Sequence, residues 1–133
     1  MNSYPRREFL LRALAACGTP LLMPSASAAA HQKPQAGAAA AGYFGVRVDA
    51  ARTIGEAYVH QLGLDTSAGS IRKASMSALE IIERASTSDD AIAALEVAVR
   101  RDFQAGRSVQ LEGWIISRTE AELCALTLLP ATN

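Results

Sequence analysis

Apolar residues recur at helical spacing in four stretches of the chain, and these stretches set the expected fold. The stretches are residues 50–62, 71–85, 89–104 and 118–129. In each of them apolar side chains return every three or four residues, which places them on one face of a helix. Residues 107–112 alternate apolar and polar side chains instead, which is the pattern of a half-buried strand. The sequence therefore predicts a mainly α fold: a small bundle of about four helices with one short β segment or hairpin.

Capping and helix-ending residues mark where the predicted helices begin and end. Asp49 is expected to cap the first helix and Ser88 the third, because both side chains can accept a hydrogen bond from a backbone amide. Ser117 and Glu120 have the spacing of a capping box, in which each side chain binds the backbone amide of the other residue. Pro130 is expected to end the last helix.

The N-terminal residues follow a pattern of their own. Arg6 and Arg7 are adjacent, Phe9 and Leu10 follow after one residue, and an interrupted apolar run continues to residue 23. A basic segment, an apolar segment and a tract of small residues are the three parts of an export signal. The order Arg-Arg-x-Phe-Leu resembles the twin-arginine (Tat) signal. The resemblance implies export to the periplasm, with the Tat translocase as a transient partner.

Two processing sites compete in this N-terminal segment. Ala26 and Ala28 form an Ala-x-Ala site, so that cleavage is expected after Ala28 or, as an alternative, after Ala30. Residues 14–17 also match a lipobox, in which Cys17 would be lipidated and become the new N-terminus. We favour cleavage at the Ala-x-Ala site, because the apolar run continues well beyond Cys17.

Cleavage after residue 28 would divide the chain into three parts. Residues 1–28 would be the signal peptide, residues 29–42 a flexible linker rich in Ala and Gly, and residues 43–133 a single small helical domain. The signal removes three of the 13 basic residues and one of the 13 acidic residues, which leaves 10 and 12 and a net charge of −2. This nearly neutral, slightly acidic charge does not indicate binding to nucleic acid, which requires an excess of basic residues. We also expect no transmembrane helix after the signal.

The part after the signal offers few groups for catalysis. Cys124 lies among apolar neighbours, where we expect a buried thiol that is inert, although a reactive thiol remains the alternative. His60 has no second ligand at metal-binding spacing. No Gly-rich phosphate loop, Cys-x-x-Cys or His-Glu-x-x-His motif occurs. We therefore expect no catalytic, cofactor-binding or metal-binding residues, no cofactor, and no enzymatic activity of the chain's own.

The segment around the single Trp is the expected site of partner contact. Trp114 follows a glycine and could anchor either the core or an interface, since Trp is frequent in binding hot spots. Val109 and Leu111 lie on one side of the predicted strand. That strand needs a partner, which could be residues 43–48 or a strand of another chain. Trp114, Val109 and Leu111 are thus the predicted partner contacts.

The resemblances suggest a role for the exported domain. The chain is similar to small Tat-exported bacterial proteins that end in a Gly-Trp-x-x-Ser-Arg-Thr-Glu segment, here residues 113–120, a group for which the resemblance implies export but no activity. In layout it is also similar to the small subunits of periplasmic flavin dehydrogenases, which carry the Tat signal for a catalytic subunit. The expected function is an accessory subunit, without its own catalytic site, that co-exports or stabilises a partner oxidoreductase. The alternatives are a stand-alone helical domain that binds a small molecule or peptide, and an enzyme that uses Cys124 or His60.

Overall fold

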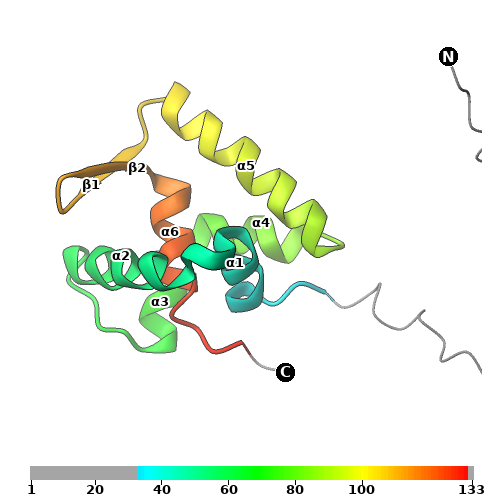
Figure 1. Cartoon of the computed structure of the whole chain (residues 1–133), viewed down its shortest axis with the longest axis horizontal. Helices are drawn as coiled ribbons and strands as arrows, with labels where there is room; N and C mark the ends of the chain where they lie inside the picture. The colour runs from blue at the N-terminus through cyan, green and yellow to red at the C-terminus, as the bar shows by residue number, and fades with distance from the viewer. Residues whose placement is uncertain (1–32, 132–133) are drawn as a thin grey trace, which may run out of the picture.

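The structure is a computed structural model that describes residues 33–131, and it confirms the mainly α class with one antiparallel hairpin (Figure 1). In chain order the elements are α1 (Ala36–Phe44), the 3₁₀ turn η2 (Gly45–Arg47), α2 (Val48–Gln61), α3 (Ala68–Ala74), α4 (Met76–Arg84), α5 (Ser88–Gln104), β1 (Ser108–Leu111), β2 (Trp114–Ser117) and α6 (Arg118–Leu126). The signal residues and the alternative lipidation site lie outside the described residues; they are Arg6, Arg7, Phe9, Leu10, Cys17, Ala26 and Ala28.

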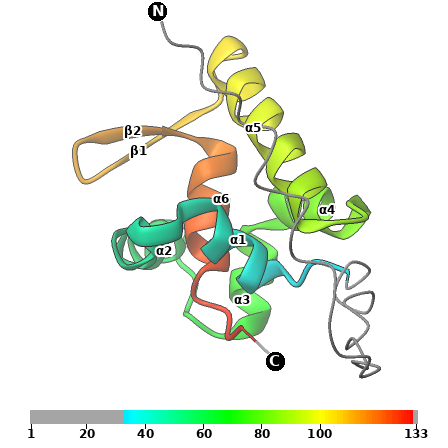
Figure 2. The same ribbon diagram turned by 45° about the vertical axis from the view of Figure 1, so that its right-hand side comes forward.

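Helix α6 is the centre of the domain. Its residues from Ala121 to Leu126 are all buried, and only the first turn retains exposed positions. Figures 1 and 2 agree in showing α6 between α2 on one side and α4 and α5 on the other. A helix that is covered on all faces belongs to the core. The other elements are therefore positioned by the way they pack on α6.

The contact between α2 and α6 is closest at Gly55. A Cβ atom at this position would lie 2.3 Å from the carbonyl oxygen of Cys124, which is backbone and cannot rotate away. Tyr58 and Val59 of α2 are buried beside this contact. The absence of a side chain at position 55 thus allows the two helix backbones to approach, and this approach fixes where α2 lies.

The predicted helix over residues 71–85 is interrupted at Ser75, which separates α3 from α4. The backbone of Ser75 leaves the helical region, with φ −121° and ψ 27°. Glu122 of α6 accepts a hydrogen bond of 2.8 Å from the amide of Ala78, the third residue of α4. A capping serine would normally bind that amide. Because Glu122 takes this role, the buried Ser75 hydroxyl has no hydrogen-bond partner within residues 33–131.

The prediction of a flexible linker over residues 29–42 is wrong from residue 36 onward. Those residues form α1, in which Gly37, Ala39 and Ala40 are buried. Alanine has the highest helix propensity, and its small side chain lets α1 lie close to its neighbours. A Cβ atom at Gly37 would lie 2.8 Å from the carbonyl oxygen of Leu129, so this glycine permits a close approach of the C-terminal segment. The folded domain therefore begins before residue 43.

Several local predictions near the helix starts are also wrong. Residues 43–48 are not extended, because they complete α1, form η2 and open α2. Asp49 does not cap α2, which already begins at Val48. Helix α5 is capped by Thr87 rather than Ser88, since the Thr87 hydroxyl accepts a hydrogen bond of 3.1 Å from the amide of Asp90. The start of α5 depended on which hydroxyl reached the free amides, whereas α2 begins without a side-chain cap, directly after η2.

The two strands pair with each other, which answers the open choice of partner for β1. Leu111 lies opposite Trp114, and the turn between them consists of Glu112 and Gly113, both with positive φ angles of 49° and 85°. Two such residues are typical of the tight turns that join hairpin strands. The capping box at the start of α6 is confirmed by two reciprocal hydrogen bonds of 3.0 Å between Ser117 and Glu120.

Within the described residues, none of the helices combines the length and the apolar character that crossing a membrane requires.

Candidate functional site

The hairpin carries two consecutive large apolar side chains that are largely exposed. Trp114 is 71% exposed and Ile115 is 66% exposed. Neighbouring residues of a strand point to opposite faces, so these two side chains present apolar surface on both faces of β2. Each face of β2 therefore carries one exposed large apolar side chain.

A groove of about 460 Å³ lies between the hairpin and α2, and we call it the hairpin groove. It is lined by Ala50, Thr53, Ile54 and Ala57 of α2 and by Leu111, Glu112, Trp114 and Ile116 of the hairpin. Only Thr53 and Glu112 contribute polar side chains. The groove is thus mainly apolar, and one of its walls is α2, whose position depends on the contact with α6 at Gly55.

The three predicted partner contacts have different surroundings in the structure. Trp114 is exposed, so the alternative that it anchors the core is wrong. Leu111 is 4% exposed and belongs to the core, while Val109 is partly buried against it. Of these three residues only Trp114 offers a largely free side chain. Ile115 was missed, because its exposure depends on pairing β2 with β1, which the sequence had left open.

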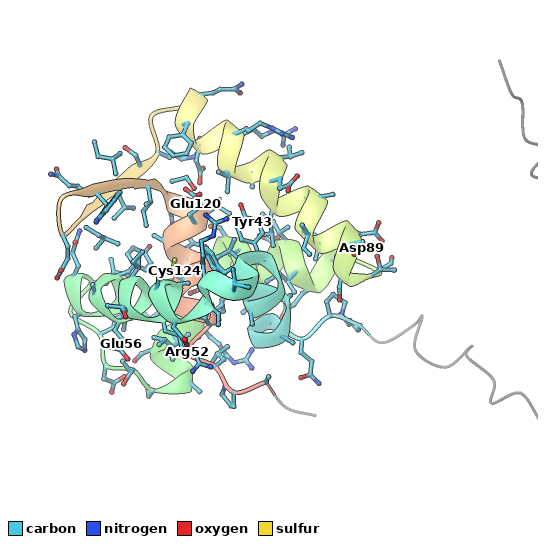
Figure 3. All side chains as sticks on the ribbon, viewed as in Figure 1. Tyr43, Arg52, Glu56, Asp89, Glu120 and Cys124 are labelled. Carbon is cyan, nitrogen blue, oxygen red and sulfur yellow. The ribbon has the colours of Figure 1, made fainter. Side chains whose placement is uncertain are left out.

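A second cleft, of about 430 Å³, lies between α1, α2, α5 and α6. Figure 3 shows Tyr43, Glu120 and Cys124 gathered in this region, and Arg47 and Glu96 also line the cleft. Burial raises the pKa of the Tyr43 hydroxyl, and the carboxylates of Glu120 and Glu96 raise it further. The cleft therefore holds a protonated phenol beside two acidic residues. One of them, Glu120, is already engaged in the capping box.

Cys124 is buried in this region, as expected from its apolar neighbours. Burial raises the pKa of the thiol from 9.0 to about 12, and the charge of Glu120 adds to the effect. Only the thiolate is nucleophilic, so this cysteine is inert at neutral pH. His60 is exposed on α2 and borders a different groove with Gln61 and Glu112. The structure does not bring Cys124 and His60 into one cleft.

Two buried carboxylates organise the polar part of the core, and neither was anticipated. Asp102 of α5 is 5% exposed and Glu122 of α6 is 1% exposed. Asp102 accepts hydrogen bonds of 2.7 Å from both the amide and the hydroxyl of Thr119, and one of 2.8 Å from Nε of Arg107. Burial alone would raise the pKa of Asp102, but these hydrogen bonds outweigh it and lower the pKa.

The apolar repeat over residues 89–104 predicts Phe103, rather than Asp102, on the buried face of α5. Phe103 is 51% exposed, and Asp102 takes the inward position. The first amides of a helix have no acceptor within that helix and need one from elsewhere. Asp102 provides an acceptor for α6, just as Glu122 does for α4. In the sequence, the one sign of this capping role is an acidic residue directly beside the apolar stripe of a predicted helix.

Within residues 33–131, no group of three or more His, Cys, Asp or Glu side chains is arranged to hold a metal ion. Comparison of the chain with protein-family models, with curated proteins and with solved structures found no match.

Proposed function

We propose that the protein is a Tat-exported periplasmic accessory subunit that binds a partner oxidoreductase through the hairpin and the hairpin groove. The observation that carries this proposal is the exposure of Trp114, which lines the apolar hairpin groove. The twin arginines, Arg6 and Arg7, resemble a Tat signal and support export, and a small subunit that carries such a signal can take a partner with it. The role of the chain in this proposal is binding, without a catalytic site of its own.

The chemistry of the hairpin groove indicates what the partner presents. The groove is apolar along Ala50, Ile54 and Ala57, so it suits an apolar side chain rather than a charged one. Trp114 lines the groove and would be desolvated when this side chain binds. Trp is enriched among the hot-spot residues near the centre of interfaces. The outer edge of each hairpin strand has no strand beside it among the described residues, so a partner strand could also pair there.

The proposal is tested by purification of the tagged full chain from the periplasm of its own organism. We expect an oxidoreductase subunit without a signal peptide to be recovered with it in a fixed ratio. A variant in which Arg6 and Arg7 are both replaced by Lys provides the control, because it should retain both proteins in the cytoplasm. Recovery of the tagged protein as a lone monomer from the periplasm would contradict the proposed role.

One observation favours the alternative of a stand-alone binding domain. The volume of the hairpin groove, about 460 Å³, lies in the range of small-molecule sites, which is roughly 300–1,000 Å³. In this case the protein would be recovered without a partner, and an apolar ligand would change the fluorescence of Trp114. The purification described above distinguishes the two functions, because only the accessory role requires a second polypeptide.

A further inference from the structure

Three arginine side chains surround a further groove, where α4, α5 and the start of α6 meet. The groove has a volume of about 500 Å³ and includes Arg101 of α5, Arg107 of the segment before β1, and Arg118 of α6. Its apolar part is formed by Ile81 of α4 together with Val97 and Ala98 of α5. We call it the arginine groove. It is distinct from the hairpin groove, since the two share no lining residue.

The arginines are paired in a way that leaves donors free. Arg107 binds Oδ1 of Asp102 through Nε at 2.8 Å, and Arg118 binds Oε1 of Glu122 through Nε at 3.0 Å. The terminal Nη atoms of both guanidinium groups make no hydrogen bond within the described part of the chain. Arg101 makes no ion pair there. Half or more of the side-chain surface of Arg107 and Arg118 is exposed, 50% and 56%.

Both oxygens of each carboxylate that pairs with these arginines already accept at least one hydrogen bond. Oδ2 of Asp102 accepts from the amide and the hydroxyl of Thr119, and Oε2 of Glu122 accepts from the amide of Ala78. Both acidic side chains are buried, so they hold the two guanidinium groups in place at the groove. Glu80 on α4 is paired with Arg84 instead. With three arginines against the two carboxylates of Asp102 and Glu122, the arginine groove has one positive charge in excess, and the two paired arginines retain free Nη donors.

We propose that the arginine groove binds a small organic acid, with its carboxylate on the guanidinium groups and its hydrocarbon part on Ile81, Val97 and Ala98. Guanidinium groups bind carboxylates through two parallel hydrogen bonds, and free Nη atoms are what this geometry needs. The groove volume lies within the range of small-molecule sites. Holding the donors in place before binding lowers the cost of binding. This site is independent of the hairpin groove and of the proposed partner.

The test is a titration of the full chain with hexanoate, followed by NMR chemical shifts of the backbone amides. The variant is Arg101→Gln, because Arg101 makes none of the hydrogen bonds that join α5 and α6. The matched control is Arg100→Gln, since Arg100 is the preceding residue of the same helix, is exposed, and does not line the groove. Hexylammonium tests the sign of the charge, and acetate tests the contribution of the hydrocarbon part.

We expect saturable shifts at the amides around the arginine groove with hexanoate, weaker shifts with acetate and none with hexylammonium. Loss of one charge-assisted hydrogen bond should weaken hexanoate binding about tenfold in Arg101→Gln, and Arg100→Gln should bind as the unaltered protein does. The proposal is overturned if hexanoate shifts none of these amides, or if Arg101→Gln binds hexanoate as tightly as Arg100→Gln. Equal affinities for acetate and hexanoate would show that the hydrocarbon part of the ligand is not bound, and this result would also overturn the proposal.

Discussion

Replacement of Gly55 by alanine tests the packing of α2 on α6. The added Cβ atom would lie 2.3 Å from the carbonyl oxygen of Cys124, 2.5 Å from its carbonyl carbon and 2.8 Å from the amide nitrogen of Ala125. All three atoms are backbone, so no side chain can rotate to relieve the contact. An ordinary contact of this kind is 3.4 Å or longer, and α2 would have to move by roughly 1 Å, the difference between the two distances.

Two opposing effects decide the magnitude. Overpacking of a core costs typically about 1–3 kcal/mol, and a contact with rigid backbone belongs at the upper end of this range. Alanine gains about 0.5–1 kcal/mol over glycine in a helix interior. The net loss should be about 1–2.5 kcal/mol in the free energy of unfolding, which corresponds to a fall in Tm of roughly 5–15 °C for a domain of this size.

The assay is urea denaturation followed by circular dichroism at 222 nm, with Gly42→Ala as the matched control. Gly42 lies in α1, and a Cβ atom there would meet nothing within 4 Å. The control should therefore be neutral or slightly more stable, by up to about 1 kcal/mol. Equal stabilisation by Gly55→Ala and Gly42→Ala would refute the close approach of α2 and α6.

Three further predictions concern the buried polar and titratable groups. Asp102→Ala should destabilise the domain by about 2–3 kcal/mol, because Thr119 and Arg107 lose a charged acceptor. The hydrogen bonds that lower the pKa of Asp102 stabilise the folded protein at pH values above 3.8, the ordinary pKa of aspartate. The free energy of unfolding should therefore fall as the pH drops below about 4. This fall should be less steep in Asp102→Asn. The pKa of Cys124, raised to about 12, predicts that iodoacetamide at pH 8 modifies this residue only after unfolding in urea. Mass analysis of the peptide that contains Cys124 would record this, and rapid modification in the native protein would contradict it.

The helices after residue 50 could be predicted because their apolar residues repeat at a spacing that only a helix places on one face. The capping box at Ser117 and Glu120 was also predictable, because it depends on two residues three positions apart. Helix α1 was not, because its apolar residues are nearly all small. An Ala- and Gly-rich sequence has the same composition whether it packs closely or remains a linker, and only the approach of the C-terminal segment at Gly37 distinguishes the two.

The sites were harder to predict than the helices, because they depend on distant partners. Trp114 could be identified as a possible contact from its residue type, but its exposure required the pairing of β1 with β2. The roles of Asp102 and Glu122 arise from helix starts that lie 17 and 44 residues away along the chain. No local pattern contains those separations. The arginine groove follows from the same two carboxylates and was for that reason also missed.

The proposed partner contact is tested most directly by the variant Trp114→Ala in the tagged full chain. Met76→Ala is the matched control, since Met76 is also a large exposed apolar residue, at 67%, but lies at the start of α4. Both variants should retain the helical circular dichroism of the unaltered protein. A hot-spot residue contributes about 2 kcal/mol or more, so the affinity for the copurified oxidoreductase subunit should fall about 30-fold or more in Trp114→Ala and remain unchanged in Met76→Ala. Equal recovery of the partner by both variants would contradict binding through the hairpin.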